Sequence, residues 1–366
     1  MHDYKRTIYT AIDLFCGSGA VTAALRNQGF DVLAALDNDP IACKTYRLNH
    51  PGVKLIEGDI RKVNPESILT SNSSVFGVDL LVFCAPCQPF SSQNRNRSPD
   101  GRARLLLEAG RYARALKPKC MLFENVPGLT SPSHAEVVDT LAQQLRREGY
   151  ILSAPRRLDA AETGVPQRRV RCVMIASQAR DAADAFQQAT VKAKRRTVRE
   201  AIGQLKPLRS GESDPEDDLH RARTHRPIAL DRLRAIPIDG GSRAELPMHL
   251  RLKCHTDDHS FSDVYGRMRW DDVAPTLTTG CDDITRGRFA HPDQDRAITL
   301  REAALLQTFP LNYRFSGSRS DMARQIGNAV PVAMVEALAP ILKQLISFSQ
   351  HPTGQTPLGL RLADGK

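Results

Sequence analysis

The sequence lacks the segments that would hold a protein in or across a membrane. No uninterrupted apolar run approaches the roughly 20 residues of a transmembrane helix. The first residues, Met1–Arg6, are polar and contain no apolar core of a secretory signal peptide. We therefore expect an intracellular, cytoplasmic protein that does not contact a membrane.

Regularly spaced cysteine is also lacking. The eight cysteines are scattered along the chain, which is typical of reduced thiols in a cytosolic protein. The spacing of Cys254, His255, His259 and Cys281 lacks the paired Cys-x-x-Cys knuckles of structural zinc sites. A zinc interpretation of Cys254, His255, His259 and Cys281 stays open, but without those knuckles we predict loop residues and expect no metal.

Positive charge, in contrast, is abundant. The 366 residues include 51 lysines and arginines against 41 aspartates and glutamates, a net charge of +10. This excess favours a polyanionic partner, although many soluble enzymes are basic without binding nucleic acid. The length suffices for one large or two ordinary domains.

Alternating apolar strands and amphipathic helices predict an α/β fold from Thr10 to about Ser177. Such alternation is typical of a mostly parallel sheet with helices on both faces. The predicted strands are Ile8–Leu14, Asp31–Leu36, Lys54–Glu57, Val78–Phe83, Cys120–Phe123, Ile151–Leu158 and Val170–Ala176. The predicted helices are Ala20–Gln28, Pro40–Leu48, Ala103–Leu116 and Ala135–Glu148. Pro40 suits a first helical turn and Gly29 a helix end.

After about Gln178 the alternation ends. The chain from Lys206 to Asp295 is irregular and rich in Pro, Gly, Arg, His and Asp. This composition predicts a second, smaller domain of short strands and functional loops. Further helices are expected at Thr197–Leu205, Leu300–Gln307 and Pro331–Phe348.

A thiol and a carboxyl follow two of the predicted strands. Ala85-Pro86-Cys87-Gln88 comes after Val78–Phe83, and Glu124-Asn125-Val126 follows Cys120–Phe123. In an open α/β sheet, ligands bind outside the carboxyl ends of the strands, so both groups should open into one crevice. A nucleophile and a proton donor there could add to a polarised double bond and activate the adjacent carbon.

A glycine-containing turn predicts a cofactor at the same edge of the sheet. Asp13–Ala20 leaves the first strand, turns on Gly17 and Gly19 and enters a helix whose N-terminus offers free N–H groups. Asp37 ends the second strand, where an acidic residue commonly binds ribose hydroxyls. A Gly-x-x-x-x-Gly-Lys-Ser/Thr phosphate loop is absent, which argues against a nucleotide triphosphatase. A dinucleotide stays possible on these residues alone.

Taken together, these blocks resemble the DNA (cytosine-5) methyltransferase family. The similarity spans Asp13 to Pro331 and leaves about Gln178 to Phe261 unmatched. The matching blocks, in the family's order, are Asp13–Ala20, Asp37, Gly58–Ile60, Ala85–Ser91, Glu124–Val126, Gln167–Arg171, Tyr265–Trp270, Ala274–Thr279, Thr299–Glu302 and Gln325–Pro331. Ala20 and Cys84-Ala85 stand where the family often has glycine, and neither departure removes a reactive group. Several such blocks in order are specific.

The resemblance implies S-adenosylmethionine as cofactor, S-adenosylhomocysteine as product and duplex DNA as substrate. In the family mechanism, the Cys87 thiolate adds to C6 of a flipped-out cytosine while Glu124 supplies a proton or hydrogen bond at N3. C5 then attacks the sulfonium methyl, and loss of the C5 proton expels the thiol. Arg169 and Arg171 would hold the cytosine edge and the Glu124 side chain. The implied catalytic residues are Cys87, Glu124, Arg169 and Arg171.

The resemblance also implies binding residues. Phe15 would stack on adenine, and Asp37 would bind the ribose. The implied cofactor contacts are Phe15, Gly17, Ser18, Gly19, Asp37, Asn38, Asp59, Ile60, Leu105, Asn328 and Val330. The implied DNA contacts are Gln88, Ser91, Ser92, Arg95, Arg97, Gln167, Arg267 and Thr278. Gln88–Asp100 is expected to be a mobile loop that closes over the flipped base.

The resemblance divides the chain into a Rossmann-like S-adenosylmethionine-dependent methyltransferase domain and a target-recognition domain. Residues 1–190 would form the catalytic domain, residues 191–317 would read DNA, residues 318–348 would return to the catalytic domain, and residues 349–366 would be a disordered tail. A monomeric bacterial or phage enzyme is expected, nucleoid-associated and paired with a cognate restriction endonuclease or defence genes.

Three alternatives stay open. A tRNA cytosine-5 methyltransferase would use the same chemistry, but the long segment Lys206–Asp263 favours a reader of DNA sequence. A non-catalytic, cofactor-sensing DNA-binding protein would have no need of the complete catalytic set. A redox pair of Cys84 and Cys87 would be expected to open a helix in a small domain without Glu124-Asn125-Val126.

Overall fold

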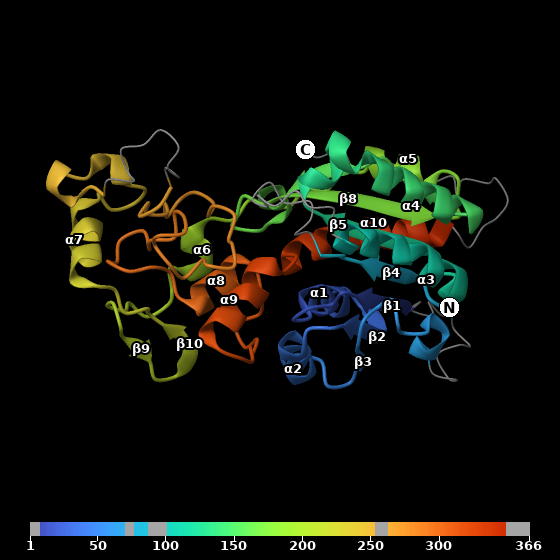
Figure 1. Cartoon of the computed structure of the whole chain (residues 1–366), viewed down its shortest axis with the longest axis horizontal. Helices are drawn as coiled ribbons and strands as arrows, with labels where there is room; N and C mark the ends of the chain where they lie inside the picture. Colours follow the sequence, from blue (N-terminus) through green and yellow to red (C-terminus); the bar gives the residue numbers. More distant parts are fainter. Residues whose placement is uncertain (1–7, 70–76, 87–100, 253–262, 349–366) are drawn as a thin grey trace, which may run out of the picture.

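An eight-stranded sheet forms the centre of the larger of two lobes (Figure 1). The structure is a computed structural model that describes residues 8–69, 77–86, 101–252 and 263–348. The strand order is β3-β2-β1-β4-β5-β8-β6, and β7 also pairs with β8. The strands are β1 (Tyr9–Leu14), β2 (Phe30–Asp37), β3 (Lys54–Glu57), β4 (Leu80–Phe83), β5 (Cys120–Asn125), β6 (Ile151–Leu152), β7 (Arg156–Asp159) and β8 (Val170–Ser177).

The sheet confirms the predicted α/β fold. β1 to β5 pair in parallel, whereas β8 runs antiparallel to β5, β6 and β7. The strand predicted at Ile151–Leu158 is divided into β6 and β7, with Pro155 between them. Proline has no N–H to donate to a sheet ladder, so the interruption falls where the sequence places it.

Helices cover both faces of the sheet, as predicted. Alternation along each strand sends Leu80 and Val82 to one face and Leu81 and Phe83 to the other. The first face packs on α1 (Ala20–Asn27), α5 (Ala182–Gln188) and α10 (Val332–Phe348). The second packs on α3 (Ala109–Leu116) and α4 (Ala135–Arg147).

Local signals set the ends of the early helices. In α2 (Pro40–Asn49), the Asp39 side chain accepts from the backbone N–H groups of Ile41 and Ala42, and Pro40 occupies the first turn. Gly29 follows α1 with a φ of +77°, a conformation that favours glycine. The helix predicted from Ala103 begins as a 3₁₀ segment, η4 (Gly101–Glu108), before α3.

The smaller lobe consists mainly of loops (Figure 1). Its elements are α6 (Val198–Ile202), β9 (Ser213–Asp214), β10 (Asp217–Arg221), α7 (Pro227–Ala235) and α8 (Leu300–Leu306). The next helix, α9 (Arg319–Asn328), contacts α8 and precedes α10 of the sheet lobe. The 3₁₀ segments of the whole described chain, besides η4, are η1 (Pro65–Ile68), η5 (Pro127–Thr130), η6 (Pro132–His134), η7 (Ala160–Thr163), η8 (Arg243–Glu245) and η9 (Met248–Leu250). Of these, η8 and η9 are in the smaller lobe. Sequence analysis did not predict α5, α7 or α9.

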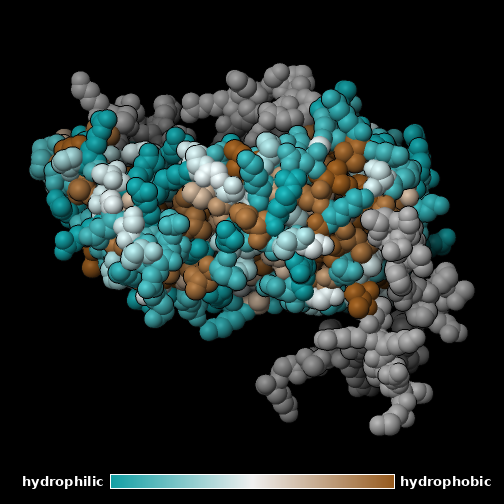
Figure 2. All heavy atoms as spheres, turned by 90° about the horizontal axis from the view of Figure 1, so that it is seen from below, coloured by the Kyte–Doolittle hydropathy of each residue, from teal (hydrophilic) through white to brown (hydrophobic). Residues whose placement is uncertain are grey.

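The two lobes share one apolar core. Leu219, Met268 and Leu277 of the smaller lobe belong to the same buried cluster as Leu338 and Leu342 of α10. On the outside, the face in Figure 2 shows apolar side chains interspersed among hydrophilic ones. Burial of a common core holds the small lobe against the sheet lobe.

Within the described ranges, Arg319–Phe348, which contains α9 and α10, is the one helical stretch long and apolar enough to cross a membrane. Of its most apolar window, 56% is buried inside the protein. Leu338, Ala339 and Leu342 of α10 pack against α1 and the sheet. Packing in the core therefore accounts for the apolar character of this helix.

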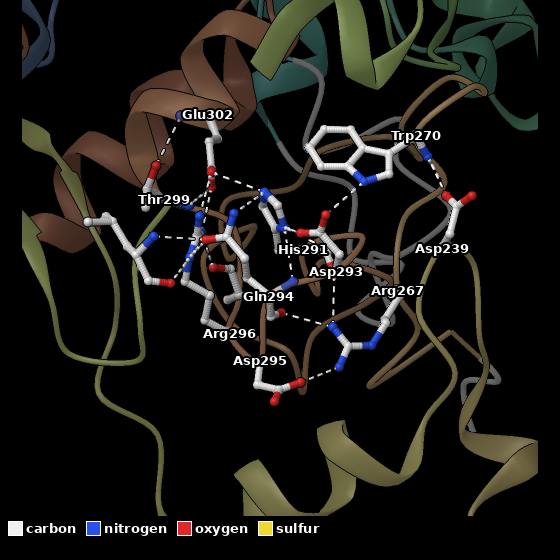
Figure 3. A network of polar contacts seen from close by, with 12 residues as sticks. Asp239, Arg267, Trp270, His291, Asp293, Gln294, Asp295, Arg296, Thr299 and Glu302 are labelled. Carbon is white, nitrogen blue, oxygen red and sulfur yellow. Dashed lines mark hydrogen bonds and ion pairs between the residues drawn. The ribbon is translucent and has the colours of Figure 1, made fainter. Parts of the chain in front are cut away.

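A buried polar network holds the loops of the smaller lobe together (Figure 3). Arg296 donates to both carboxylate oxygens of Glu302, at 2.8 and 2.7 Å. The Nδ1 atom of His291 accepts from the backbone N–H of Gln294 at 3.2 Å, and His291 Nε2 lies 3.5 Å from Glu302. Burial lowers the pKa of His291 to about 4, while the Arg296 guanidinium overcomes burial and lowers the pKa of Glu302 to about 2.

Acidification is expected to destabilise the protein before its carboxylates titrate. The unfolded chain takes up a proton at each histidine near pH 6.5. Burial also lowers the pKa of His50 to about 4. In the folded protein, His291 and His50 therefore stay neutral until the pH falls to about 4. The stability that these neutral histidines give the folded state is fully present above pH 6.5. It is lost between pH 6.5 and 4, by about 1–3 kcal/mol for each histidine. Glu302 adds a loss as the pH falls below about 4.5.

Thermal unfolding followed from pH 7.5 to pH 4.5 measures this loss. The exchange His291→Gln should flatten the pH dependence, whereas His249→Gln, at an exposed position, should leave it unchanged. A melting temperature that stays constant over this range would contradict the argument.

Candidate active site

A cavity of about 520 Å³ opens beyond the carboxyl ends of β1, β2, β4 and β5. This is the edge of the sheet at which the sequence predicts the site. Its walls come from the segments after these strands, from the start of β8 and from α9. The lining residues are Phe15–Ser18, Ala20, Val21, Asp37–Asp39, Ala42, Arg61, Cys84–Pro86, Leu105, Glu124, Arg171, Arg324, Gln325 and Asn328–Val330.

The turn after β1 has an unusual backbone. Phe15, Gly17 and Gly19 all have positive φ angles, of 59°, 52° and 92°. Only glycine adopts this region at little cost, which explains two of the three residue types. The turn leads into α1, which has no side-chain cap at its N-terminus. The uncapped N–H groups there favour an anionic group.

Asp37 fixes this turn. One of its carboxylate oxygens accepts from the backbone N–H of Gly17 at 2.8 Å, and the other accepts from that of Asp39 at 2.8 Å. Burial raises the pKa of Asp37. Each oxygen retains a lone pair, so the side chain can still accept from a ligand hydroxyl.

Glu124 and Arg171 form a buried ion pair in the cavity wall. Arg171 Nε lies 2.9 Å from a Glu124 carboxylate oxygen, and the two side chains are only 10% and 11% exposed. Burial raises the pKa of Glu124, whereas the charges of Arg171 and Arg169 oppose the rise. Glu124 is therefore placed to hold a proton more readily than an exposed glutamate.

Asn125 joins the two strand ends that carry the chemistry. Its side-chain amide donates to the carbonyl oxygen of Ala85 at 3.1 Å. This bond fixes the chain just before Pro86 and Cys87 relative to Glu124. Cys87 itself lies outside the described residues, as do Gln88, Ser91, Ser92, Arg95 and Arg97.

Arg169 does not line the cavity, and its expected contact with the cytosine edge stays a prediction. It is buried and donates to the backbone carbonyl oxygens of Leu277 at 3.0 Å, Gly327 at 2.8 Å and Ala329 at 3.0 Å. Carbonyls at a helix end lack helical partners, so they attract a guanidinium. Arg169 thus joins the end of α9 and the 277 loop to the sheet.

Gln167 and Arg267 bond other parts of the chain in this structure, and their expected contacts with DNA stay predictions. Buried Gln167 bonds Gln307 at 2.9 Å and the backbone N–H of Leu277 at 2.9 Å. Arg267, which is 1% exposed, points into the loop network in Figure 3. It pairs with Asp295 and donates to the carbonyl oxygens of Leu233, Ile236, His291 and Gln294. Thr278 is half-buried, and its contact with DNA stays a prediction.

Most of the expected cofactor residues meet in the cavity. Eight of them line it, namely Phe15, Gly17, Ser18, Asp37, Asn38, Leu105, Asn328 and Val330. Gly19, Asp59 and Ile60 are outside the lining. The Asp59 carboxylate pairs with Arg61, and the Ile60 side chain is buried in the apolar core.

Sequence analysis missed the wall supplied by Arg61, Arg324 and Gln325. Arg324 pairs with Asp39 at 3.2 Å, joining α9 to the segment after β2. The capping box of Ser318 and Asp321 at the start of α9 was the available signal for this helix. No local pattern indicates Arg61.

The described residues bear on the redox alternative only through Cys84, and the zinc alternative stays untested because Cys254, His255 and His259 lie outside the described residues. Cys84 follows β4 and does not open a helix, and burial raises the pKa of its thiol, whereas a reactive thiol needs a lowered pKa. Among the described residues, no group of three or more potential ligands could hold a metal ion.

The sequence model of the C-5 cytosine-specific DNA methylase family matches residues 9–344. The chain belongs to this family. It is a DNA cytosine-5 methyltransferase.

The family's curated members include similar full-length relatives. The Type II methylase M.HgiDII of Herpetosiphon aurantiacus is 38% identical, over 92% of this chain and 95% of the relative. The Type II methyltransferase M.AgeI of Thalassovita gelatinovora is 30% identical, over 92% of this chain and 99% of the relative. Both relatives are named as Type II methylating enzymes.

Solved structures share the fold. The crystal structure of S. pombe Dnmt2 methyltransferase superimposes with a TM-score of 0.62 at 21% identity, over 92% of this chain and 98% of that one. The family member therefore has the Rossmann-like fold of the methyltransferases.

Proposed function

We propose that this enzyme transfers a methyl group from S-adenosylmethionine to C5 of a flipped cytosine in a specific sequence of double-stranded DNA. The observation that carries the proposal is the buried Glu124–Arg171 pair, which shares one cavity with the turn after β1 and Asp37. The cavity joins a proton donor to a nucleotide-binding wall, as cytosine methylation requires.

The residues present fit S-adenosylmethionine. A volume of about 520 Å³ is within the range of small-molecule sites. Asp37 would accept from the ribose hydroxyls, Phe15 would pack on the adenine, and the N-terminus of α1 would face the carboxylate. Buried Gln325 Oε1 has no hydrogen-bond partner in the described part of the chain, so it offers an acceptor for an amino group. When bound there, S-adenosylmethionine supplies a methyl group on a positively charged sulfur.

The chain's own residues activate the base. The Cys87 thiolate adds to C6, and Glu124 gives a proton or hydrogen bond at N3, which places electron density on C5. Loss of the C5 proton then expels the thiol. Arg171 orients Glu124 and limits the rise of its pKa, so that the carboxyl can give and recover a proton.

Base flipping follows from the burial of Glu124. A carboxyl that is only 11% exposed cannot reach N3 of a cytosine paired within a duplex. The base must leave the stack, at a cost of a few kcal/mol. Gln88, Ser91, Ser92, Arg95 and Arg97, together with Thr278, are proposed to contact the DNA around it.

The division of labour between the lobes is part of the proposal. Residues 1–190 and 318–348 would carry the cofactor and chemistry, and residues 191–317 would read the DNA sequence. The net charge of +10 supports a partner that carries many phosphate groups, as DNA does. A monomer acting beside a cognate restriction endonuclease is in keeping with the Type II relatives.

A mechanism-based trap tests the proposal. Fluorine at C5 cannot leave as a proton, so a duplex with 5-fluorocytosine at the recognised site should hold the enzyme in a denaturation-resistant adduct. The adduct should require S-adenosylmethionine and should disappear in Cys87→Ser, because a serine hydroxyl is a much poorer nucleophile than a thiolate. Denaturing electrophoresis of labelled DNA measures it.

The same assay separates the alternatives. Cys84→Ser should still form the adduct, contrary to a redox pair. An adduct that persists in Cys87→Ser would overturn the catalytic assignment. Trapping on tRNA and never on duplex DNA would favour the RNA substrate, and the absence of any adduct on 5-fluorocytosine-substituted genomic DNA would favour a non-catalytic binder.

A further inference from the structure

Two buried side chains, Tyr313 and His50, contact backbone carbonyls of the turn after β1. The Tyr313 hydroxyl donates to the carbonyl oxygen of Ser18 at 2.6 Å. His50 Nε2 lies 3.1 Å from the carbonyl oxygen of Gly19 and 3.0 Å from the Tyr313 hydroxyl. Tyr313 and His50, each 4% exposed, are outside the cavity lining. Both side chains therefore contact the turn without lining the cavity.

We call Tyr313 and His50 together the clamp. Their hydrogen bonds are consistent with one protonation state of the His50 ring. Arg26 approaches His50 Nδ1 at 3.5 Å, and a guanidinium only donates. Nδ1 must therefore accept, and the ring proton resides on Nε2. That proton faces the Tyr313 oxygen and the Gly19 carbonyl, which leaves the tyrosine hydrogen for Ser18. Burial lowers the pKa of His50 to about 4 and keeps the ring neutral.

Tyr313 comes from a distant part of the chain. It lies in the segment between α8 and α9, which docks on α2 through three hydrogen bonds. Asn49 bonds both the N–H and the carbonyl of Arg314, at 3.0 and 2.8 Å, and the Thr45 hydroxyl accepts from Ser316 at 2.8 Å. Packing against Phe309 and Phe315 fixes the tyrosine ring. The segment is thus built to place the hydroxyl.

Gly19 has room for no other residue beside this clamp. A Cβ atom there would lie 2.7 Å from the His50 ring and 2.9 Å from the Tyr313 hydroxyl. The clamp contacts a turn in which Phe15, Gly17 and Gly19 adopt positive φ angles. Such a backbone persists only when surrounding contacts hold it. Turning the carbonyls of Ser18 and Gly19 toward the clamp leaves the N–H groups at the start of α1 for the cavity.

We propose that Tyr313, assisted by His50, is a positioning residue for the cofactor: it holds the Ser18 and Gly19 carbonyls so that the turn and the N-terminus of α1 are pre-organised to bind S-adenosylmethionine. The inference rests on the proposed function of this cavity. Pre-organisation lowers the ordering cost of binding, so loss of the clamp weakens affinity and leaves the chemistry intact.

Calorimetric titration with S-adenosylhomocysteine tests the inference on the full-length protein. Tyr313→Phe removes one hydroxyl and should weaken binding about tenfold. His50→Phe leaves the Tyr313–Ser18 bond in place and should weaken it less. Tyr150→Phe is the matched control, because the buried Tyr150 hydroxyl donates to the Pro118 carbonyl at 2.7 Å, outside the cavity lining. Tyr150→Phe should lose about as much folding stability as Tyr313→Phe but should bind S-adenosylhomocysteine as tightly as wild type.

Kinetics distinguish positioning from general destabilisation. Tyr313→Phe should raise KM for S-adenosylmethionine, with kcat at saturating cofactor and KM for DNA unchanged. If wild-type protein fails to bind the ligand, the proposed function is overturned, and this inference with it. If wild type binds and Tyr313→Phe binds equally well, or no worse than Tyr150→Phe, only the inference is overturned. Should Tyr313→Phe not fold, His50→Phe decides by the same comparison.

Discussion

Replacing Glu124 by glutamine is expected to lower kcat for DNA methylation by about 10²- to 10⁴-fold, the usual contribution of a positioned acid. The amide keeps the size of the side chain and can still donate a hydrogen bond, but it cannot transfer a proton to the base. Glu124 is buried beside Arg171, and burial raises its pKa. The loss should therefore appear in kcat, with S-adenosylhomocysteine affinity nearly unchanged. Single-turnover methylation and calorimetry measure the two quantities.

Glu148→Gln is the matched control for Glu124→Gln. Glu148 also pairs with an arginine, Arg114, at 2.7 Å, but that arginine is on the surface. The control should keep wild-type activity. If Glu124→Gln retained more than about a tenth of wild-type kcat, below the range expected of acid catalysis, Glu124 would not be the proton donor.

Replacing Arg267 by methionine is expected to destabilise the smaller lobe by about 3–5 kcal/mol, because several carbonyl oxygens lose a buried donor at a cost of about 1–3 kcal/mol each. Methionine fills much of the space but donates nothing. The exchange would leave four carbonyl oxygens and Asp295 without the donor that joins their loops. Denaturant unfolding should show the loss, and methylation should fall because the lobe no longer holds its shape.

Arg234→Met is the control for Arg267→Met. Arg234 lies on the surface and pairs with Asp231 at 3.2 Å, so its removal should change stability by less than about 1 kcal/mol. The comparison also separates the two roles considered for Arg267. A variant with wild-type stability and weakened DNA binding would support the role of DNA contact and contradict the buried network.

Local patterns were sufficient to predict the sheet lobe and most of the cavity. Apolar runs that are buried on both faces indicate parallel strands, and Pro40, Gly29 and the turn after β1 mark element ends by their backbone preferences. Strand ends in such a sheet lie at one edge, so Asp37 and Glu124 could be placed together before any coordinates. The approach of Asn125 to Ala85 needed the folded structure, because strand spacing alone does not orient a side chain.

The arginines show where sequence analysis was insufficient. Arg169 directly precedes β8 and Arg171 is in it, and their side chains are chemically identical. Arg171 nevertheless pairs with Glu124, whereas Arg169 bonds the carbonyls at the end of α9. Their roles differ because α9, absent from the predicted elements, covers only one of them.

What the sequence by itself determined is therefore the order of strands and helices from β1 to β8, the turn after β1 and the edge at which the chemistry is placed, because each depends on residues close together in the chain. Only the tertiary structure decided that Arg267 and Gln167 are internal braces and that α9 closes the cavity. It also decided that Tyr313 meets Ser18 across 295 positions. The physical reason is that a buried donor bonds whichever unpaired carbonyl the fold brings to it, and that pairing is created by packing between distant segments.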